Sequence, residues 1–328
     1  MHDTPLLSPV TVWVLSDGKI GDETQCFGIA ETLGVAAQRR LIAPRPLYAW
    51  LMPYGPIDPR DGPDRHNSPL APPYPDIAIA AGRRTVAYLR YLKNLSGGRT
   101  FTIFMKDPYV GVRAADLIWV PQHDKLRGPN VIVTATPAHR IRSDLLAAAR
   151  KTPDPQLAAL PAPRIAMILG GPSTHHRYSQ ANDRELAAVA RSLASQGLSV
   201  MVTGSRRTPP TTLAAVKTAL AGAPGQHFIW DGTGGNPYVA MLALADAIFV
   251  TGDSVNMMAE AAATGVPVHI YEPDGGHPKM TAFIDHLIAA GAARRWAGKL
   301  EHWSYAPIDA TPVIAAEIAR RYLAWRGA

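Results

Sequence analysis

The sequence of 328 residues is poor in cysteine and in charged residues, and it contains no long apolar run. Cys26 is the only cysteine, so no intrachain disulfide can form, and this fits a reducing compartment. No window of eighteen residues is cleanly apolar, so we expect no membrane-spanning helix. Residues 1–9 lack a basic segment ahead of an apolar run, so we expect no signal peptide. We therefore expect a cytoplasmic protein, and attachment to the surface of the inner membrane is left open.

Several binding motifs are also absent. The sequence holds no G-x-G-x-x-G fingerprint, no Walker loop and no G-x-S-x-G elbow. It has no basic run, no zinc-knuckle spacing and no alternation of aromatic and basic residues, so we do not expect nucleic acid as a partner. No cluster of acidic residues suits a divalent cation. We therefore predict no metal site and no cofactor.

The composition that remains is that of a globular protein. Hydrophobic residues make up 47% of the chain, and its length suits two domains of ordinary size. The formal net charge is +7 at neutral pH. This excess favours an anionic substrate or an anionic lipid surface, although solubility alone would also account for it. The sequence does not indicate an oligomeric state.

Short apolar runs alternate with helical patterns along the whole chain, which is typical of an α/β protein with parallel sheets. In the first half we predict strands at residues 11–15, 38–42, 76–80, 100–105, 117–120 and 131–134, and helices at residues 22–33, 83–95 and 140–151. Residues 44–75 contain ten prolines. Such a density of proline resists regular structure, so we predict a long loop with short turns there.

The alternation begins again in the second half. We predict strands at residues 164–169, 198–203, 227–230, 248–250 and 268–271, and helices at residues 183–195, 210–220, 237–243, 278–290 and 311–325. A further helix is predicted between Asp253 or Ser254, as its cap, and Gly265. We therefore divide the chain into a Rossmann-like domain at residues 1–151, a proline-rich linker at 152–163, a second Rossmann-like domain at 164–310 and a terminal helix at 311–328.

Ligands of doubly wound sheets bind beyond the carboxyl ends of the strands, so the loops at those ends are the candidate sites. After the first predicted strand, Gly18 permits close backbone approach and Lys19 is a partner for an anion. Asp17 and Asp22 are candidate general bases, although Asp22 also suits a helix cap. Arg83 lies at another predicted helix start, which again suits an anion.

The second domain opens with a similar loop. Gly170 and Gly171 follow a buried strand, and the hydroxyls of Ser173 and Thr174 complete a candidate oxyanion cradle. Arg177 adds a charged donor for a phosphate. The alternative is a glycine turn with capping hydroxyls and no ligand.

Two further loops complete the candidate site. Ser205 and Arg206 follow a predicted strand and could contact a base or a phosphate, although Arg206 also suits an exposed surface. In the last loop, a helix begins after Gly252, Asp253 and Ser254, and its free amides suit a phosphate. Asn256 and Glu260 lie on the same helix face as Asp253, where a carboxylate could accept hydrogen bonds from ribose hydroxyls. The alternative is a structural helix with a solvated Glu260.

These loops carry a resemblance to a known family, the mitochondrial fission ELM family. The matching segments run in the family's order over nearly the whole chain: Ser16-Asp17-Gly18-Lys19, Ala80-Ala81-Gly82-Arg83-Arg84-Thr85, Gly128-Pro129-Asn130-Val131, Gly170-Gly171-Pro172-Ser173, and Thr251-Gly252-Asp253-Ser254 with Met257 and Glu260. The family includes a plant factor of the mitochondrial outer surface and many bacterial proteins. This resemblance implies either a role in membrane fission without catalysis or an activity still to be assigned.

The second half is also similar to the nucleotide-sugar domain of GT-B glycosyltransferases, in particular the transferase that adds N-acetylglucosamine to the lipid-linked peptidoglycan precursor. Ser254, Glu260 and the run from Ala262 to Pro267 match that enzyme's pattern. The resemblance implies that Ser254 and its neighbours bind diphosphate and that Glu260 binds ribose. The first half departs from the pattern, because it has Asp17-Gly18-Lys19 where the enzyme carries a histidine-containing glycine loop.

The resemblance implies a GT-B-like α/β fold of two Rossmann-like, doubly wound parallel-sheet domains that face across a cleft, with the final helix crossing back to the first. The implied function is metal-independent transfer of a sugar from a nucleoside diphosphate sugar to an unknown acceptor, for which a lipid-linked or membrane-surface molecule is left open. Two alternatives remain at this stage. One is a nucleotide-sugar epimerase or hydrolase on the same fold, and the other is a non-catalytic interaction protein of membrane fission.

Overall fold

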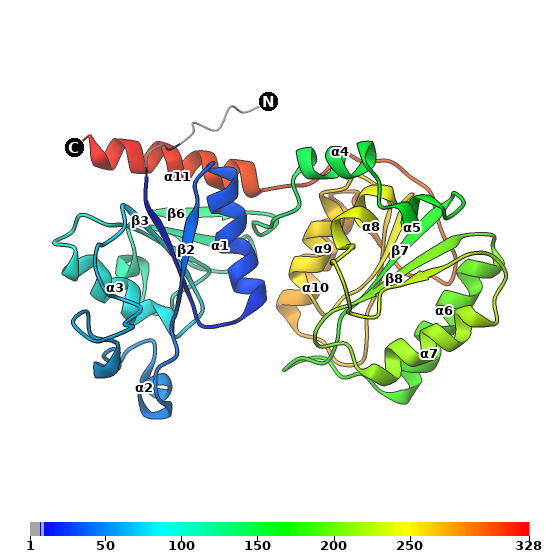
Figure 1. Ribbon diagram of the computed structural model, residues 1–328, viewed down its shortest axis with the longest axis horizontal. Helices are drawn as coiled ribbons and strands as arrows, with labels where there is room; N and C mark the ends of the chain where they lie inside the picture. Colours follow the sequence, from blue (N-terminus) through cyan, green and yellow to red (C-terminus); the bar gives the residue numbers. More distant parts are fainter. Residues whose placement is uncertain (1–6, 8–9, 328) are drawn as a thin grey trace. The chain divides into compact units, whose positions relative to one another are not determined.

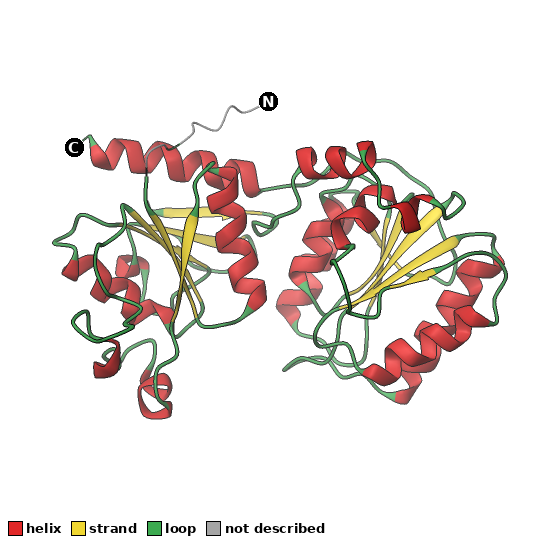
Figure 2. Cartoon of the chain, viewed as in Figure 1, coloured by secondary structure: helices red, strands yellow, loops and turns green. Residues whose placement is uncertain are grey.

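The computed structural model describes residue 7 and residues 10–327, and the chain divides into two compact units. Unit 1 comprises Met1–Arg140 and Ala310–Ala328, and unit 2 comprises Ile141–Asp309. In each unit a parallel sheet lies between layers of helices (Figure 2). Parallel strands buried on both faces are short, nearly continuous apolar runs, which is why most of them are recognisable in the sequence.

The sheet of unit 1 has six parallel strands in the order β2-β1-β3-β4-β5-β6. The strands are β1 (Val12–Ser16), β2 (Ala37–Leu41), β3 (Ile77–Ala81), β4 (Phe101–Met105), β5 (Leu117–Pro121) and β6 (Val131–Thr134). The order of the strands reverses between β1 and β3, which pair in parallel from Val12 opposite Ile77. The carboxyl edge at such a reversal is where doubly wound sheets bind ligands.

Side chains of unit 1 alternate between two cores, one on each face of the sheet. Val12 and Val14 of β1 belong to the core under α1 (Ile20–Thr32) and α11 (Thr311–Arg326). Trp13 and Leu15 point to the opposite core, which α3 (Thr85–Leu95) covers. The remaining elements of the unit are α2 (Pro46–Leu51) and the short 3-10 helices η1 (Pro59–Asp61) and η2 (Val112–Ala114). Figure 1 shows α2 away from the sheet, beyond its carboxyl edge.

The sheet of unit 2 has the strand order β12-β11-β10-β7-β8-β9, again all parallel. The strands are β7 (Arg164–Leu169), β8 (Ser199–Gly204), β9 (Phe228–Ile229), β10 (Ala247–Thr251), β11 (Val268–Tyr271) and β12 (Ala293–Arg295). The order reverses between β7 and β10, whose residues pair from Ala247 opposite Ile165. Loops that follow these two strands therefore meet at one point of the carboxyl edge.

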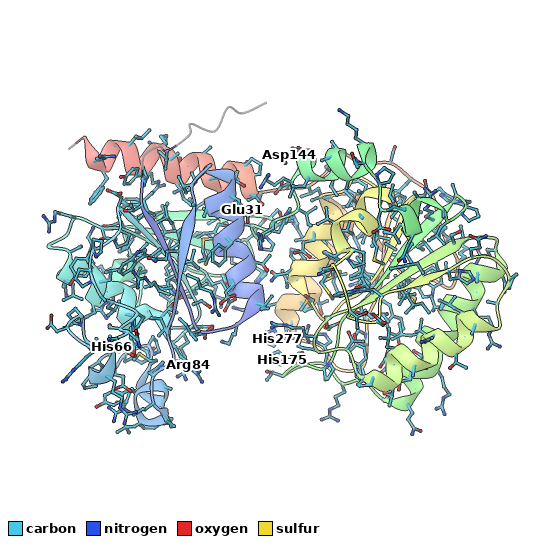
Figure 3. All side chains as sticks on the ribbon, in the orientation of Figure 1. Glu31, His66, Arg84, Asp144, His175 and His277 are labelled. Carbon is cyan, nitrogen blue, oxygen red and sulfur yellow. The ribbon has the colours of Figure 1, made fainter. Side chains whose placement is uncertain are left out.

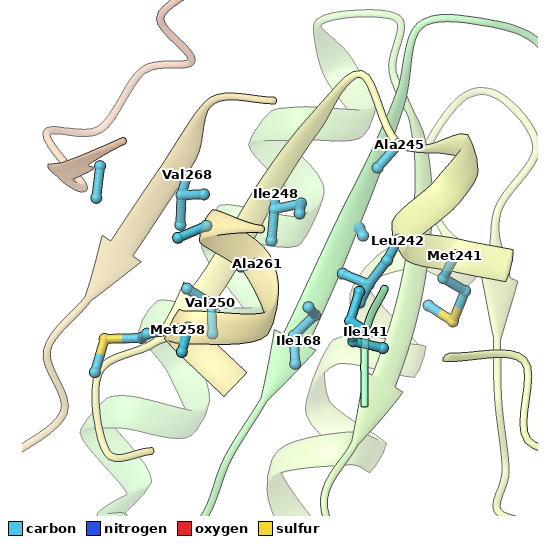
Figure 4. Close-up of a cluster of buried hydrophobic side chains, with 14 of the residues drawn as sticks. Ile141, Ile168, Met241, Leu242, Ala245, Ile248, Val250, Met258, Ala261 and Val268 are labelled. Carbon is cyan, nitrogen blue, oxygen red and sulfur yellow. The ribbon is translucent and has the colours of Figure 1, made fainter. Parts of the chain in front are cut away.

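Helices cover both faces of this second sheet. One face packs against α4 (Ser143–Lys151), α5 (Pro155–Ala158), α8 (Tyr238–Leu244), α9 (Val255–Ala262) and α10 (Pro278–Ala289). Figure 4 shows this core, with Ile168, Ile248 and Val250 of the sheet facing Leu242 and Met258 of the helices. The other face packs against α6 (Gln180–Ser195) and α7 (Pro210–Ala221).

The prediction of an α/β protein with two doubly wound parallel sheets is confirmed, and most predicted elements lie within a few residues of their positions. The loop predicted at residues 44–75 contains α2 and η1, and β12 was not predicted. The structure places the boundary between the units after Arg140, so α4 and the segment predicted as a linker belong to unit 2. The physical reason is burial, because Leu146, Leu157 and Leu160 lie in its core.

No helix in the described ranges is both long and apolar enough to cross a membrane.

Candidate functional site

The strand reversal in unit 2 brings two of the predicted loops together. Gly170 and Gly171 follow β7, and Gly252, Asp253 and Ser254 follow the neighbouring strand β10. The backbone N–H of Gly170 donates to the hydroxyl of Thr251 at 2.7 Å, which ties the two strand ends to each other. The residues predicted from two distant segments therefore lie at one place.

Asp253 is the centre of this arrangement. Its side chain is 0% exposed, and both of its carboxylate oxygens accept hydrogen bonds from the protein. Oδ2 accepts from the Gly171 amide at 3.0 Å and from the Arg207 guanidinium at 2.8 Å. Oδ1 accepts from the hydroxyls of Tyr178, at 2.8 Å, and Thr251, at 2.7 Å. The prediction that Asp253 binds a ligand is therefore corrected, because its carboxylate positions the loops and has no oxygen left for a nucleotide.

The two glycines after β7 are required by close packing. A Cβ atom on Gly170 would lie 2.1 Å from Oδ1 of Asp253, and one on Gly171 would lie 2.0 Å from the backbone oxygen of Arg207. No side chain could be accommodated at such distances without moving backbone or a buried carboxylate. The glycine pair therefore fixes how closely the β7 loop approaches its neighbours.

Helix α9 begins directly after this cluster. Ser254 is its N-cap, and its hydroxyl accepts from the amide of Met257. The positive end of the helix dipole thus lies at the carboxyl edge of the sheet, which favours a negative charge there. Asn256 lies in the first turn, and Glu260 follows one turn later. Both belong to the same helix face, as the spacing predicted.

Glu260 is nearly buried, with 8% of its surface exposed. Its Oε2 accepts a hydrogen bond from the hydroxyl of Tyr238 at 2.8 Å. Burial raises the pKa of Glu260 to about 7, and the hydrogen bond from Tyr238 opposes that rise. Oε1 accepts no hydrogen bond from the part of the chain that the structure describes. The alternative of a solvated Glu260 is excluded by its burial.

The remaining side chains of the β7 loop have mixed roles. The hydroxyl of Ser173 lies 3.1 Å from Nδ1 of His176 and accepts from the amides of His175 and His176, so it shapes the turn. Thr174 and Arg177 are exposed. The loop is held against residues 274–277, because the backbone of His176 pairs with Gly275. The ring centroids of His175 and His277 lie 4.4 Å apart, and Figure 3 labels the two residues next to each other.

The turn after β8 supports the same edge. The hydroxyls of Ser205 and Thr208 lie 3.2 Å apart, and Thr208 also donates to the carbonyl of Gly170 at 2.6 Å. The Ser205 hydroxyl is therefore part of the turn. Arg206 is exposed and makes no hydrogen bond or ion pair within the described residues. Arg206 is therefore an exposed cation in the turn after β8, whereas Arg207 is bound to Asp253.

Unit 1 carries a separate cavity of 540 Å³ at its own carboxyl edge. The residues that line it come from the loops after β1, β3 and β4 and from the segment after α2: Lys19, Asp22, Met52, Pro53, Tyr54, Gly82, Arg83, Phe104, Lys106, Asp107 and Tyr109. The ammonium of Lys106 forms an ion pair with the carboxylate of Asp22. Lys106 has a positive φ of 94°, a strained conformation for a residue with a side chain, and such strain clusters at functional sites.

The other predicted residues of unit 1 lie around this cavity. Asp17 has a side chain only 2% exposed and pairs with Lys19 at 3.3 Å. Gly82 packs on it, since a Cβ there would lie 2.8 Å from the Asp17 carboxylate. Gly18 has a positive φ of 88° and is exposed. The guanidinium of Arg83 donates to the carbonyls of Met52 and Ala49, so it holds the α2 segment as well as lining the cavity.

Several residues of these sites were missed in the sequence. Tyr178, Arg207 and Tyr238 act through partners far along the chain, so no local pattern marks them. The glycine-rich segment at residues 274–277 follows β11 and could have been found by the same reasoning as the other loops. No group of three or more His, Cys, Asp or Glu side chains among the described residues is arranged to hold a metal ion.

Sequence comparison links the chain to one family. The family model of mitochondrial fission ELM1 matches residues 20–322. Mitochondrial fission protein ELM1 of Arabidopsis thaliana is 30% identical over 280 residues, which cover 77% of this chain and 65% of that protein. The chain thus spans 65% of the length of that relative.

Structural comparison shows the fold. UDP-GlcNAc 2-epimerase from Methanocaldococcus jannaschii, in complex with UDP-GlcNAc and UDP, is similar with a TM-score of 0.51 and 10% identity, over 96% of this chain and 99% of that chain. MurG from Acinetobacter baumannii has a TM-score of 0.51 and 15% identity, over 96% of this chain and 91% of that chain. At these identities the likeness concerns the fold alone, and it is the two-domain GT-B fold of glycosyltransferases and epimerases.

Proposed function

The chain belongs to the mitochondrial fission ELM1 family, and from its GT-B fold and the site in unit 2 we propose that it is a glycosyltransferase that uses a nucleoside diphosphate sugar. One observation carries the proposal. At the strand reversal of unit 2, the start of α9 lies beside a glycine loop locked by Asp253, with a buried carboxylate one turn into the helix. A preformed edge of this kind suits a diphosphate and a ribose.

In the proposed complex, the diphosphate lies at the amino end of α9, where the helix dipole opposes its charge. Arg206 and Arg177, both exposed, supply charge-assisted donors. The ionised carboxylate of Glu260 accepts from a ribose hydroxyl through Oε1, since Oε2 already accepts from Tyr238. The ligand class follows the epimerase of this fold, which contains UDP-GlcNAc and UDP.

The reaction that we propose transfers the sugar to an acceptor hydroxyl. The bond between the anomeric carbon and the diphosphate oxygen breaks, a bond between that carbon and the acceptor oxygen forms, and the nucleoside diphosphate leaves. The acceptor proton passes to a carboxylate, and we assign this role to Asp22 because it lines the cavity of unit 1. Asp17 is the weaker choice, because its buried carboxylate packs against Gly82.

Nucleotide binding is the first test. Thermal unfolding is measured with UDP, GDP, ADP and UDP-GlcNAc at millimolar concentration, because a ligand at 100 times its Kd stabilises the folded state by about 2.7 kcal/mol. We expect one nucleotide to raise the melting temperature of the wild type. Glu260→Gln should lose most of that rise, whereas Asp285→Asn, an exposed substitution on α10, should keep it. No stabilisation by any nucleotide would refute the proposal and favour a non-catalytic interaction protein.

Turnover is the second test, and it separates the enzyme classes. Release of nucleoside diphosphate is measured with and without a lipid extract as the source of acceptor. A transferase releases it only with the extract, and a hydrolase releases it without the extract. An epimerase causes no net release and is detected by the appearance of the epimeric nucleotide sugar. Asp22→Asn should abolish transfer and leave the nucleotide-induced stabilisation unchanged, because Asp22 lies in unit 1. If Asp22→Asn transfers sugar at the wild-type rate, the assignment of the base is wrong.

A further inference from the structure

Four large apolar side chains of unit 1 are displayed to solvent around α2. The exposed fractions are 64% for Leu47, 75% for Trp50, 75% for Tyr54 and 63% for Tyr109. We call these four residues the aromatic patch. Single exposed apolar residues are ordinary, but three aromatic rings and a leucine in one place mark an interaction surface. The sugar transfer proposed above does not require these four side chains to be so exposed.

The local fold forces this exposure. Leu47 and Trp50 lie three residues apart on α2, so they share one helix face, while Ala49 turns inward and is buried. Tyr54 follows in the next turn, and its hydroxyl donates to the carbonyl of Tyr109 at 3.1 Å, which joins the α2 segment to the loop after β4. The patch is therefore built on two segments fixed to each other.

The charge beside Trp50 is positive, whereas the carboxylate of Asp107 accepts from the backbone N–H of Tyr109. A hollow of 470 Å³ next to Trp50 is lined by Pro44, Pro46, Ala49, Trp50, Arg83 and Arg84, and none of these six residues is acidic. The partners of the Arg83 guanidinium are neutral carbonyls, so its charge is not compensated. Arg84 is exposed and has no acidic partner in the described residues, and Figure 3 shows it near α2.

We propose that the aromatic patch docks on an anionic phospholipid bilayer. Tryptophan and tyrosine combine an apolar ring with a polar group, and they favour the boundary between headgroups and acyl chains. Leu47 and Trp50 enter the apolar side of that boundary, and Arg83 and Arg84 meet the lipid phosphates in the hollow beside the indole. Because Arg83 and Arg84 are positively charged, we expect this surface to bind an anionic membrane. The inference does not depend on the proposed enzymatic function, since it involves no nucleotide, although Tyr54, Tyr109 and Arg83 also line the cavity that contains Asp22.

The test is cosedimentation of the full chain with vesicles, without nucleotide. Vesicles of phosphatidylcholine with 30 mol% phosphatidylglycerol are compared with pure phosphatidylcholine at low and high salt. We expect binding to the anionic vesicles that weakens as salt rises, since the Debye length is about 10 Å at 0.1 M and about 3 Å at 1 M. The double variant Trp50→Ser with Tyr54→Ser should bind at least tenfold more weakly. Arg84→Glu should reduce binding to anionic vesicles several-fold.

Matched controls make the result specific. Leu323→Ser removes an exposed apolar side chain from α11 in the same unit and should leave binding unchanged. Arg191→Glu changes the net charge as Arg84→Glu does, but on α6 of unit 2, and should have a much smaller effect. All substituted residues are exposed, so circular dichroism should show folded proteins.

Three outcomes would overturn the proposal. The first is failure of the wild type to bind anionic vesicles, and the second is equal binding by wild type and the Trp50→Ser, Tyr54→Ser variant. The third combines two results: the wild type does not bind vesicles, and light scattering shows that the double variant differs from it in oligomeric state. These results would assign the patch to contacts between copies of the chain.

Discussion

Replacement of Asp253 by alanine is expected to lower the free energy of unfolding of unit 2 by about 4 kcal/mol, because removing one partner from a buried charged cluster costs about 3–5 kcal/mol. The carboxylate accepts four hydrogen bonds at the junction of β7 and β10. Alanine leaves the buried amide of Gly171, the buried hydroxyl of Thr251 and the part-buried hydroxyl of Tyr178 without their acceptor. It also frees the guanidinium of Arg207.

The magnitude follows from the two buried donors. A hydrogen bond to a charged group contributes about 1.5–3 kcal/mol, so the loss at Gly171 and Thr251 amounts to about 3–6 kcal/mol. The hydroxyl of Tyr178 is part-buried and adds less. Arg207 adds little, because its side chain is 41% exposed and it still donates to the carbonyls of Gly171 and Pro172. Asp253→Asn should cost about 2–3 kcal/mol, since its amide oxygen replaces Oδ1 but its NH₂ group cannot accept from Gly171.

The assay is unfolding in urea followed by circular dichroism, together with hydrogen exchange of the Gly171 amide. Hydrogen exchange reports the site directly, which matters because a chain of two units need not unfold in one step. Asp285→Ala, which removes an exposed carboxylate from α10, serves as control and should change stability by less than about 0.5 kcal/mol. If Asp253→Ala stays within about 1 kcal/mol of the wild type and Gly171 remains protected, the carboxylate does not hold the loops as described.

Three further predictions concern single residues. Gly82→Ala should destabilise unit 1 by about 3 kcal/mol in urea unfolding, because it adds a Cβ 2.8 Å from the Asp17 carboxylate at a φ of 94°. The control Gly97→Ala, where a Cβ meets open space at a φ of 60°, should cost only about 1 kcal/mol. Equal costs for the two variants would contradict the close packing of Gly82 on Asp17. Because burial raises the pKa of Glu260 from 4.5 to about 7, the folded state holds a proton that the unfolded state has released between these values. Stability should therefore fall by about 3 kcal/mol as pH rises through that window, and Glu260→Gln should remove the slope; an unchanged slope would show that the carboxyl is not the group responsible. Cys26 is 1% exposed, and burial raises the pKa of its thiol. Iodoacetamide should therefore leave Cys26 unmodified in the native protein and modify it fully in denaturant. Rapid labelling of the native protein would contradict the burial of Cys26.

Most strands and the start of α9 were predictable because their signals are local, whereas Asp22 is not a helix cap, since α1 begins at Ile20 with Lys19 as its N-cap. An apolar run followed by a glycine and small polar residues was enough to place β10 and a helix start at Asp253 or Ser254, and the structure shows Ser254 as the N-cap of α9. The same reasoning identified the loop after β7. The segment around α2 was harder to predict, because its many prolines argue against regular structure. A proline at the first helical position nevertheless permits a short helix, and Pro46 occupies that position in α2.

Local patterns did not settle what the polar side chains contact. Asp253 and Glu260 looked alike as acids near a helix start, but Asp253 is bound by four protein donors, whereas the one hydrogen bond to Glu260 among the described residues goes from Tyr238 to Oε2. Similarly, the amphipathic pattern of α4 shows that it must cover a core without showing which core. The boundary between the units was therefore placed too late in the chain.

The sequence by itself determined the alternation of strands and helices, the parallel sheets and the positions of the glycine loops, because the period of burial and the capping residues act over a few neighbours. Only the tertiary structure decided which loops meet. The strand order places β7 beside β10 although about eighty residues separate them along the chain, and it brings Tyr238 to Glu260 and Lys106 to Asp22. Hydrogen bonds and ion pairs between such distant residues depend on geometry in three dimensions, which a one-dimensional pattern does not contain.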